Sequence, residues 1–209
     1  MALIFTQKER ELLRLIAGVA DALGQPVFLV GGFVRDRLLG RPSKDMDIVC
    51  LGDGILLAEK VAAQFGSGYD LNVFRNFGTA QVRTPGLDIE FVGARKESYN
   101  PGSRKPEVLA GTLEEDMDRR DFTINTLAVK LGADSDFSIL DRFGGMKDLD
   151  AGVIRTPLDP GKAFQDDPLR MLRAARFAAQ LGFRIHEDTW KAMERDRERI
   201  RIVSQERIT

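Results

Sequence analysis

The chain has 209 residues, enough for one large or two small domains with a buried core. Its 31 Lys and Arg residues nearly balance its 32 Asp and Glu residues, so the net charge of −1 argues against a protein that binds polyanions over its whole surface. A single cysteine and a single histidine exclude an internal disulfide framework and argue against a Cys/His zinc site, which leaves carboxylates as metal ligands. The cysteine, Cys50, lies in an apolar run, which predicts a buried and inert thiol.

The chain lacks the apolar segments that membrane insertion requires. No apolar run reaches the length of a membrane span, and charged residues interrupt the start of the chain, where a signal peptide would be apolar. We therefore expect a cytoplasmic protein without a membrane partner. The sequence does not reveal the oligomeric state.

The first half of the chain predicts alternating helices and strands. Apolar residues recur at helical spacing over 7–23, 33–39 and 55–65, and short apolar or alternating runs predict strands over 27–30, 45–51, 71–74, 79–83 and 87–92. This alternation indicates an α/β domain with a mixed sheet.

The second half changes character. Residues 95–111 hold two prolines, two glycines and four basic residues without an apolar period, which predicts an exposed, mobile loop. A helix is expected over 113–131, a strand over 137–140 and turns over 141–150. After Pro157 the pattern becomes helical, with helices expected over 169–181 and 188–199. The predicted division is a sheet domain over 1–150 and an all-helical segment over 151–209.

Gly31 and Gly32 lie where the first predicted strand meets a helix. Paired glycines there let a phosphate approach the backbone, at a helix N-terminus that attracts its charge. The alternative is a purely geometric requirement, because a turn that needs positive φ also selects glycine.

Asp45 and Asp47 begin an apolar strand, whose period of two places both carboxylates on one face. Two hard oxygen ligands on a rigid strand suit Mg²⁺, as two-metal phosphoryl or nucleotidyl transfer requires. The alternative is a pair of solvated acids at a strand end. Glu90 is a candidate third carboxylate, but Asp88 has the same parity and the choice between them stays open.

The segment 119–125 gathers two arginines, a carboxylate and small polar side chains at the start of a predicted helix. The two arginines, Arg119 and Arg120, could clamp triphosphate oxygens, and Asp121 or Asn125 could hold ribose hydroxyls. The alternative is helix capping by Asp121 or Thr123 together with a surface ion pair.

Three ordered motifs carry a family resemblance. They are Gly31-Gly32-x-Val34-Arg35-Asp36 followed by Asp45-x-Asp47, then Arg119-Arg120-Asp121-Phe122-Thr123-x-Asn125, then Asp166-Asp167-Pro168-Leu169-Arg170-x-x-Arg173. From about Phe28 to its C-terminus the chain resembles class II tRNA nucleotidyltransferases (CCA-adding enzymes) and bacterial poly(A) polymerases, of the polymerase-beta-like nucleotidyltransferase superfamily. Asp166 departs from the Glu that is usual in the family, which leaves the role of that first acid in doubt.

The resemblance implies an α/β (α+β) fold: a polymerase-beta-like head with a mixed sheet, followed by a helical neck. It implies that Asp45 and Asp47 bind the catalytic metal, Mg²⁺, and Glu90 joins them as the candidate catalytic carboxylate from strand parity, with Asp88 as its alternative. It also implies nucleotide-binding roles for Arg120, Asp121, Asp167 and Arg170. The full set of candidate nucleotide-binding residues is Gly31, Gly32, Arg35, Arg120, Asp121, Asn125, Asp167, Arg170 and Arg173. In the family, helical body and tail regions that hold tRNA follow the neck, so we expect this chain to stop inside a neck-like segment.

The resemblance implies that Asp167 and Arg170 read the incoming base. Cytosine and adenine both present an exocyclic amino group beside an unprotonated ring nitrogen, so a carboxylate accepts from one and a guanidinium donates to the other. Uracil and guanine reverse this pattern and would be rejected. The alternative is that Asp167 is an N-cap before Pro168 and that Arg170 pairs with Asp166.

The sequence thus predicts a metal-dependent, template-independent enzyme that transfers CMP and/or AMP from CTP or ATP to the 3′ end of tRNA and releases pyrophosphate. The alternatives are a poly(A) polymerase restricted to ATP, an enzyme that adds only part of the CCA end, and a catalytically silent RNA- or nucleotide-binding module. The choice between CTP and ATP is not readable, because the same pair of side chains accepts both.

Overall fold

A computed structural model describes residues 2–98, 107–132 and 135–208. The chain divides into two compact units. The first unit comprises Met1–Met117 and Leu127–Leu140, and the second comprises Asp118–Thr126 and Asp141–Thr209. The sequence-based division places one boundary at residue 150, whereas each of these two units is made of two separate segments of the chain.

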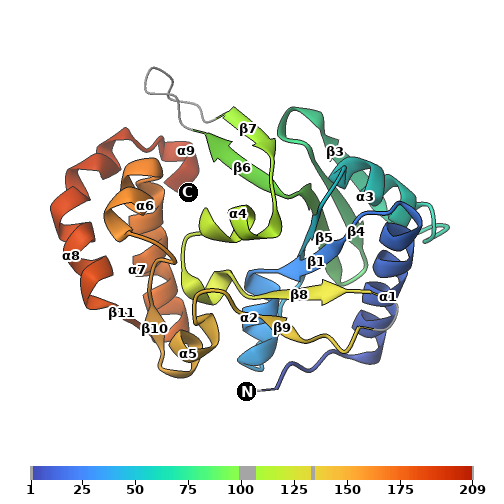
Figure 1. Cartoon of the computed structure of the whole chain (residues 1–209), viewed down its shortest axis with the longest axis horizontal. Helices are drawn as coiled ribbons and strands as arrows, with labels where there is room; N and C mark the ends of the chain where they lie inside the picture. Colours follow the sequence, from blue (N-terminus) through green and yellow to red (C-terminus); the bar gives the residue numbers. More distant parts are fainter. Residues whose placement is uncertain (1, 99–106, 133–134, 209) are drawn as a thin grey trace. The chain divides into compact units, whose positions relative to one another are not determined.

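The first unit is built on a seven-stranded sheet with the order β3-β4-β5-β2-β1-β8-β9 (Figure 1). Its strands are β1 (Val27–Val30), β2 (Asp45–Cys50), β3 (Asp70–Phe74), β4 (Thr79–Thr84), β5 (Leu87–Gly93), β8 (Ala128–Leu131) and β9 (Ile139–Leu140). β2 and β5 are parallel, and the other neighbours are antiparallel. The predicted mixed α/β fold is confirmed, with each strand expected from the first half present within one or two residues.

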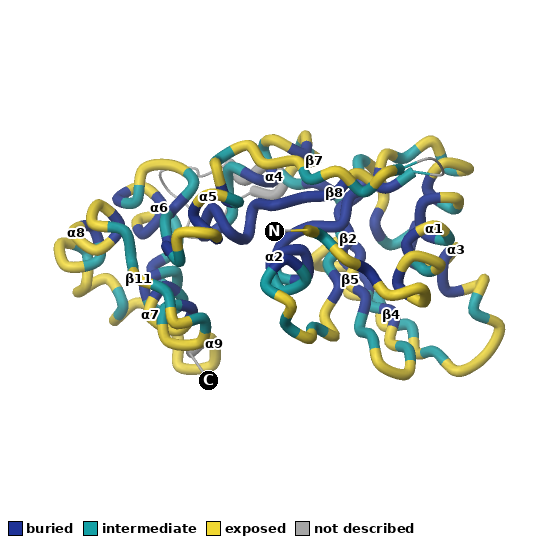
Figure 2. The backbone as a smooth tube through the Cα atoms, turned by 90° about the horizontal axis from the view of Figure 1, so that it is seen from below, coloured by how far each residue is buried: buried dark blue, intermediate teal, exposed yellow. Residues whose placement is uncertain are grey.

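Helices α1 (Gln7–Ala22), α2 (Gly32–Leu38) and α3 (Gly54–Ala62) also lie close to their predicted ranges. α3 packs against β3, β4 and β5, and α1 packs against α3 and β8. The side chains beneath α3 are apolar and buried, among them Val82, Ile89 and Phe91. Figure 2 shows how burial changes across this unit: β2 is largely in the colour of buried residues, whereas the outer sides of α1 and α3 are exposed. One face of the sheet is therefore a core.

Residues 95–111 were expected to form a loop, which is wrong at both ends. β6 (Arg95–Ser98) pairs antiparallel with β7 (Glu107–Ala110). Pairing between distant segments supplies backbone hydrogen bonds that local composition does not reveal. The remainder of the expected mobile loop, residues 99–106, lies outside the described residues.

The prediction of a helix over 113–131 is also wrong, except for the first turns of that segment. α4 (Leu113–Asp118) ends early, a short 3-10 turn follows over Thr123–Asn125, and the last four residues form β8. β8 pairs with β1, with Val27 opposite Leu131 and Val30 opposite Ala128, so pairing overrides the helical pattern. The strand expected over 137–140 is reduced to β9.

The second unit is mainly helical. Its elements are α5 (Gly145–Asp150), β10 (Val153–Ile154), α6 (Pro160–Asp166), α7 (Leu169–Leu181), β11 (Arg184–Ile185), α8 (Glu187–Asp196), a 3-10 helix (Arg197–Ile202) and α9 (Gln205–Ile208). α7 matches its predicted range, and Gly182 ends it in the left-handed conformation. The parallel bridge between β10 and β11 corrects the all-helical expectation, and α5 occupies part of the segment predicted as turns. Among the helices in the described part of the chain, none has the length and apolar character to cross a bilayer.

Candidate active site

The turn between β1 and α2 needs glycine. Gly31 has φ 76° and ψ −134°, a backbone conformation that side chains with a Cβ rarely adopt. Its N–H donates to the carbonyl of Leu127, 3.0 Å away, at the start of β8. The geometric requirement is therefore real, and the phosphate role of Gly31 and Gly32 stays a prediction.

Arg35 lies on α2, one turn beyond these glycines, and is only 6% exposed. Its Nε and Nη2 donate to the two carboxylate oxygens of Asp36, at 2.9 and 3.0 Å. A planar guanidinium held at two points has a fixed orientation. Arg35 is thus positioned near the Gly-Gly turn by its own neighbour.

Strand register brings the predicted carboxylates together. Val30, the residue before Gly31, pairs with Asp47 across β1 and β2, and Asp47 pairs with Glu90 across β2 and β5. Asp45 pairs with Asp88 in the same register. Paired residues on neighbouring strands point to the same face, with strands about 4.8 Å apart. The four carboxylates therefore share one face of the sheet, and the Gly-Gly turn adjoins the β2 pair, Asp45 and Asp47.

Glu90 and Asp88 differ in their neighbours. Glu90 is exposed and lies beside Asp47, whereas Asp88 is half-buried and its Oδ2 is 3.9 Å from Nε of Arg83. Register favours Glu90 as the partner of Asp47, and its catalytic role stays a prediction.

The donor set of this face fits a divalent cation in kind, because carboxylate oxygens are the ligands that Mg²⁺ prefers. Within residues 2–98, 107–132 and 135–208, no group of three or more Asp, Glu, His or Cys side chains is arranged to hold a metal ion. The fit therefore rests on the Asp45 and Asp47 pair.

In the second unit, Asp121 is the centre of a hydrogen-bond network. Its Oδ1 accepts from the backbone N–H of Phe122 at 2.8 Å and from Nδ2 of Asn125 at 2.9 Å, and its Oδ2 accepts from Nε of Arg173 at 2.7 Å. Asp121 and Asn125 are 8% and 6% exposed. The ion pair expected at the surface is thus anchored on a buried carboxylate.

Basic side chains converge on the same segment. Arg120 donates through Nη1 to the carbonyl of Asn125 at 3.4 Å, and Arg170 donates through Nη2 to the carbonyl of Arg119 at 2.5 Å. Arg173 and Arg176 both lie over the ring of Phe177, at 5.3 and 5.1 Å from its centroid. The second and third sequence motifs therefore meet within this unit.

Asp167 has two partners. Its Oδ1 accepts from the backbone N–H of Leu169, the first residue of α7, at 3.2 Å; the N-cap residue of α7 is Pro168, so the expected N-cap position of Asp167 is off by one residue. Its Oδ2 accepts from Nη2 of Arg207 at 2.9 Å. Arg207 was missed by sequence reasoning, because it follows Asp167 by 40 residues and no local pattern marked it.

A second missed residue is Asp148 on α5, which is 5% exposed. Its Oδ2 accepts from the hydroxyl of Thr123 at 2.7 Å and from Nε of Arg155 at 3.0 Å. The backbone N–H of Thr123 also donates to the carbonyl of Arg155 at 2.8 Å. This cluster fixes the middle of the 119–125 segment, and nothing in the local sequence of Asp148 signalled it.

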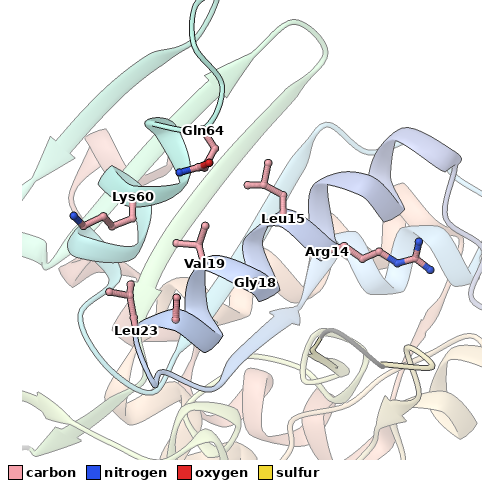
Figure 3. Close-up of a pocket in the computed structure, with 8 residues that line it drawn as sticks. Arg14, Leu15, Gly18, Val19, Leu23, Lys60 and Gln64 are labelled. Carbon is pink, nitrogen blue, oxygen red and sulfur yellow. The ribbon is translucent and has the colours of Figure 1, made fainter.

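The predicted site residues divide evenly between the units. Gly31, Gly32, Arg35, Asp45, Asp47 and Glu90 belong to the first unit, and Arg120, Asp121, Asn125, Asp167, Arg170 and Arg173 belong to the second. A hollow of about 470 Å³ between α1 and α3 is lined by other residues, including Leu15, Val19 and Lys60 (Figure 3). A second hollow, of about 380 Å³ beside Gly52–Gly54 and Asn76–Gly78, also contains none of them.

Comparison with known proteins confirms the resemblance drawn from the motifs. Residues 27–155, well over half of the chain, match the family described as the poly A polymerase head domain. The A-adding tRNA nucleotidyltransferase of Geobacter sulfurreducens is 43% identical over 179 residues, which are 85% of this chain and 20% of that protein. A solved CCA-adding enzyme, apo form II, superposes with a TM-score of 0.86 at 38% identity, over 98% of this chain and 48% of that one.

A Thermotoga maritima CCA-adding enzyme complexed with tRNA gives a TM-score of 0.81 at 36% identity, over 98% of this chain and 46% of that one. The chain spans about a fifth of the Geobacter protein and about half of these solved structures. These matches cover both units. The chain belongs to the family of the poly A polymerase head domain.

Proposed function

We propose that this chain supplies the catalytic part of an enzyme that transfers CMP and/or AMP from CTP or ATP to the 3′ end of tRNA, building or repairing CCA and releasing pyrophosphate. Its relatives are named as tRNA nucleotidyltransferases and CCA-adding enzymes, and one was solved with tRNA. The expected location is the cytoplasm.

Enzymes of this nucleotidyltransferase family generally use a divalent metal, and we propose Mg²⁺. Asp45 and Asp47 would hold it. The bound ion would neutralise phosphate charge and make the terminal hydroxyl of the RNA a better nucleophile. Glu90, paired with Asp47 across the strands, would add a third carboxylate on the side of β5.

The chain's own cations would bind the triphosphate. Arg35 has a fixed guanidinium beside the Gly-Gly turn, where a backbone without Cβ atoms admits an anion closely. In the second unit, Arg120 would bind phosphates, while Asp121 and Asn125 would hold the sugar. Arg173 would help to hold the sugar indirectly, because its guanidinium donates a hydrogen bond to the carboxylate of Asp121.

Base selection would fall to Asp167 and Arg170. Their positions near the start of α7 place an acceptor and a donor within one helical turn, which fits cytosine and adenine and rejects uracil and guanine. Each of these two side chains also has a partner in the protein that would orient it. Arg207 donates to Asp167, and Arg170 donates to the carbonyl of Arg119.

The observation that carries the proposal is the register of β1, β2 and β5, which sets Asp47 between the residue preceding Gly31 and Glu90. The test is incubation with each labelled nucleoside triphosphate, Mg²⁺, and tRNAs that end before or within the CCA sequence. Transfer of CMP or AMP, but not of UMP or GMP, is expected. If the folded chain transfers no nucleotide, the remaining alternative is a catalytically silent module that binds RNA or nucleotide.

A second candidate is addition of the terminal A alone. The Geobacter relative, at 43% identity, is named A-adding. The same assay separates the two: an A-adding enzyme extends only tRNA that ends in CC, and a full CCA-adding enzyme also extends tRNA that ends before the first C.

A further inference from the structure

The sheet face that carries the predicted carboxylates continues beyond them across β4 to the edge strand β3. Register aligns Asp47, Glu90, Gln81 and Asn72 in one row across the four strands β2, β5, β4 and β3. Phe74 follows Asn72 by two positions and shares its face. The row therefore joins the candidate metal site to the edge of the sheet.

Burial alternates along most of these strands as an open face requires, although Thr79, which pairs with Phe74 on this face, is buried. Asn72, Phe74 and Glu90 are exposed and Gln81 is half-buried, whereas Val82 and Ile89, on the opposite face, are fully buried beneath α3. Phe74 as a whole residue is 46% exposed. A large aromatic side chain at the end of a polar row on an open sheet is available to stack on a planar ligand.

The chemistry of this face suits bases better than phosphates. Asn72 and Gln81 each carry a donor and an acceptor and can pair with base edges, and Phe74 can stack on a base of any identity. In the neighbouring register row, Arg83 stands between Asp70 and Asp88, so the face as a whole would repel a phosphate backbone laid against it. A single nucleic-acid strand bound to this face would turn its bases toward the sheet and its phosphates toward solvent.

The span of the row matches a short single strand. Asn72 lies three strands from Asp47, and neighbouring strands are about 4.8 Å apart. Sheets that recognise single-stranded RNA stack two or three bases across a surface of four strands. The row thus has room for the nucleotides just upstream of a reacting 3′ end.

We propose that the exposed row over β4 and β3, formed by Gln81, Asn72 and Phe74, binds the last unpaired nucleotides of the RNA that is extended, with Phe74 stacking on a base. The inference rests on the proposed function for the direction of the strand, because it places the 3′ hydroxyl at Asp47 and Glu90. The occupant is single-stranded RNA, and the contacts are independent of the incoming nucleotide.

The test measures binding of the full chain to a short single-stranded RNA in the absence of nucleotide, and the KM for RNA and for ATP or CTP in the transfer assay. F74A should weaken RNA binding and raise the KM for RNA about tenfold, the loss of one stacked base, with the KM for nucleotide unchanged. N72A and Q81A should act in the same direction by smaller factors. F77A and Q64A are the controls, because Phe77 is an exposed aromatic residue in the 3-10 turn (Arg75–Phe77) after β3, where it lines the hollow beside Gly52–Gly54, and Gln64 lines the hollow between α1 and α3 (Figure 3).

Crosslinking gives an independent readout. An RNA with 4-thiouridine two nucleotides from its 3′ end should crosslink to β3 or β4. Equal RNA affinity of F74A and F77A, or crosslinks confined to other segments, would overturn the inference, as would a change in oligomeric state of F74A, which would assign the face to a second copy. A wild-type chain that binds RNA through Phe74 but transfers no nucleotide would refute the proposed function and leave the binding face intact.

Discussion

Arg207 on α9 binds Asp167 at the start of α7 through Nη2 and Oδ2, which are 2.9 Å apart. The side chain of Asp167 is 26% exposed and that of Arg207 is 54% exposed, so solvent screens the pair and its direct contribution to stability is small. The contact instead fixes one oxygen of a carboxylate whose other oxygen accepts from the backbone N–H of Leu169, the first residue of α7.

Replacing Arg207 with alanine should therefore reduce discrimination against UTP and GTP a few-fold while leaving the thermal unfolding midpoint almost unchanged. Asp167→Ala, which removes the acceptor itself, should reduce discrimination about tenfold or more, as expected for a hydrogen-bond partner that a bound base would bury and that is then worth roughly 1–3 kcal/mol. Arg201→Ala, in an exposed pair with Glu198, is the matched control. Unchanged selectivity in the Arg207 variant would make the contact merely structural.

The sequence predicted the elements of the first unit because each has a strong local pattern and a local stop signal, such as Gly24 after α1. It failed over 113–131 because pairing with β1, which no local pattern encodes, converts the last four residues into β8. The candidate site divides in the same way. Asp45, Asp47 and the Gly-Gly turn can be recognised within 17 residues of sequence, whereas the arginine partners of Asp121 and Asp167 lie 52 and 40 residues away in the chain.

Loss of either strand carboxylate should abolish transfer. In Asp45→Asn and Asp47→Asn the side-chain volume is kept and the negative charge is lost, so turnover should fall by at least about a hundredfold, while nucleotide binding falls less. Circular dichroism checks that the variants are folded, and single-turnover kinetics measures the rate of the nucleotidyl-transfer step. Glu90→Gln and Asp88→Asn form a matched pair: the Glu90 variant should lose the greater part of turnover, and a greater loss in the Asp88 variant would reassign the third carboxylate.

Asp121 should matter for stability as well as for activity. Its replacement by alanine leaves the Phe122 N–H, the Asn125 amide and the Arg173 guanidinium without their acceptor. Removing one partner from a buried hydrogen-bond network costs roughly 1–3 kcal/mol, so denaturant unfolding should show a lower free energy of unfolding. Asp118→Ala, whose carboxylate accepts from Arg142 at a more exposed position, is the control. Equal loss in both variants would mean that the Asp121 network adds no special stability.

Cys50 should be unreactive while the chain is folded. Burial, with a smaller effect from the charge of Asp53, raises the pKa of the thiol from 9.0 to about 11, and the thiolate is the reactive form. Iodoacetamide at pH 8 should modify Cys50 only after denaturant is added. Since the folded state binds this proton more tightly than the unfolded state, the free energy of unfolding should decrease as the pH rises from about 9 toward 11. Cys50→Ala should flatten that part of the pH profile, and rapid labelling of the native chain would show that the thiol is accessible.

The 209 residues by themselves should bind tRNA weakly and with strong dependence on salt. The net charge of −1 offers no extended surface that neutralises phosphates, and such contacts supply most of the affinity of proteins for nucleic acids. Local attraction can come from Arg173 and Arg176, which are held together over Phe177. Each phosphate contact adds about one unit to the slope of log affinity against log salt, so filter binding at low and moderate ionic strength measures how many contacts form. A double substitution of Arg173 and Arg176 by glutamine should lower both the affinity and that slope, whereas tight binding that resists salt would reveal an RNA surface built mainly from stacking and hydrogen bonds.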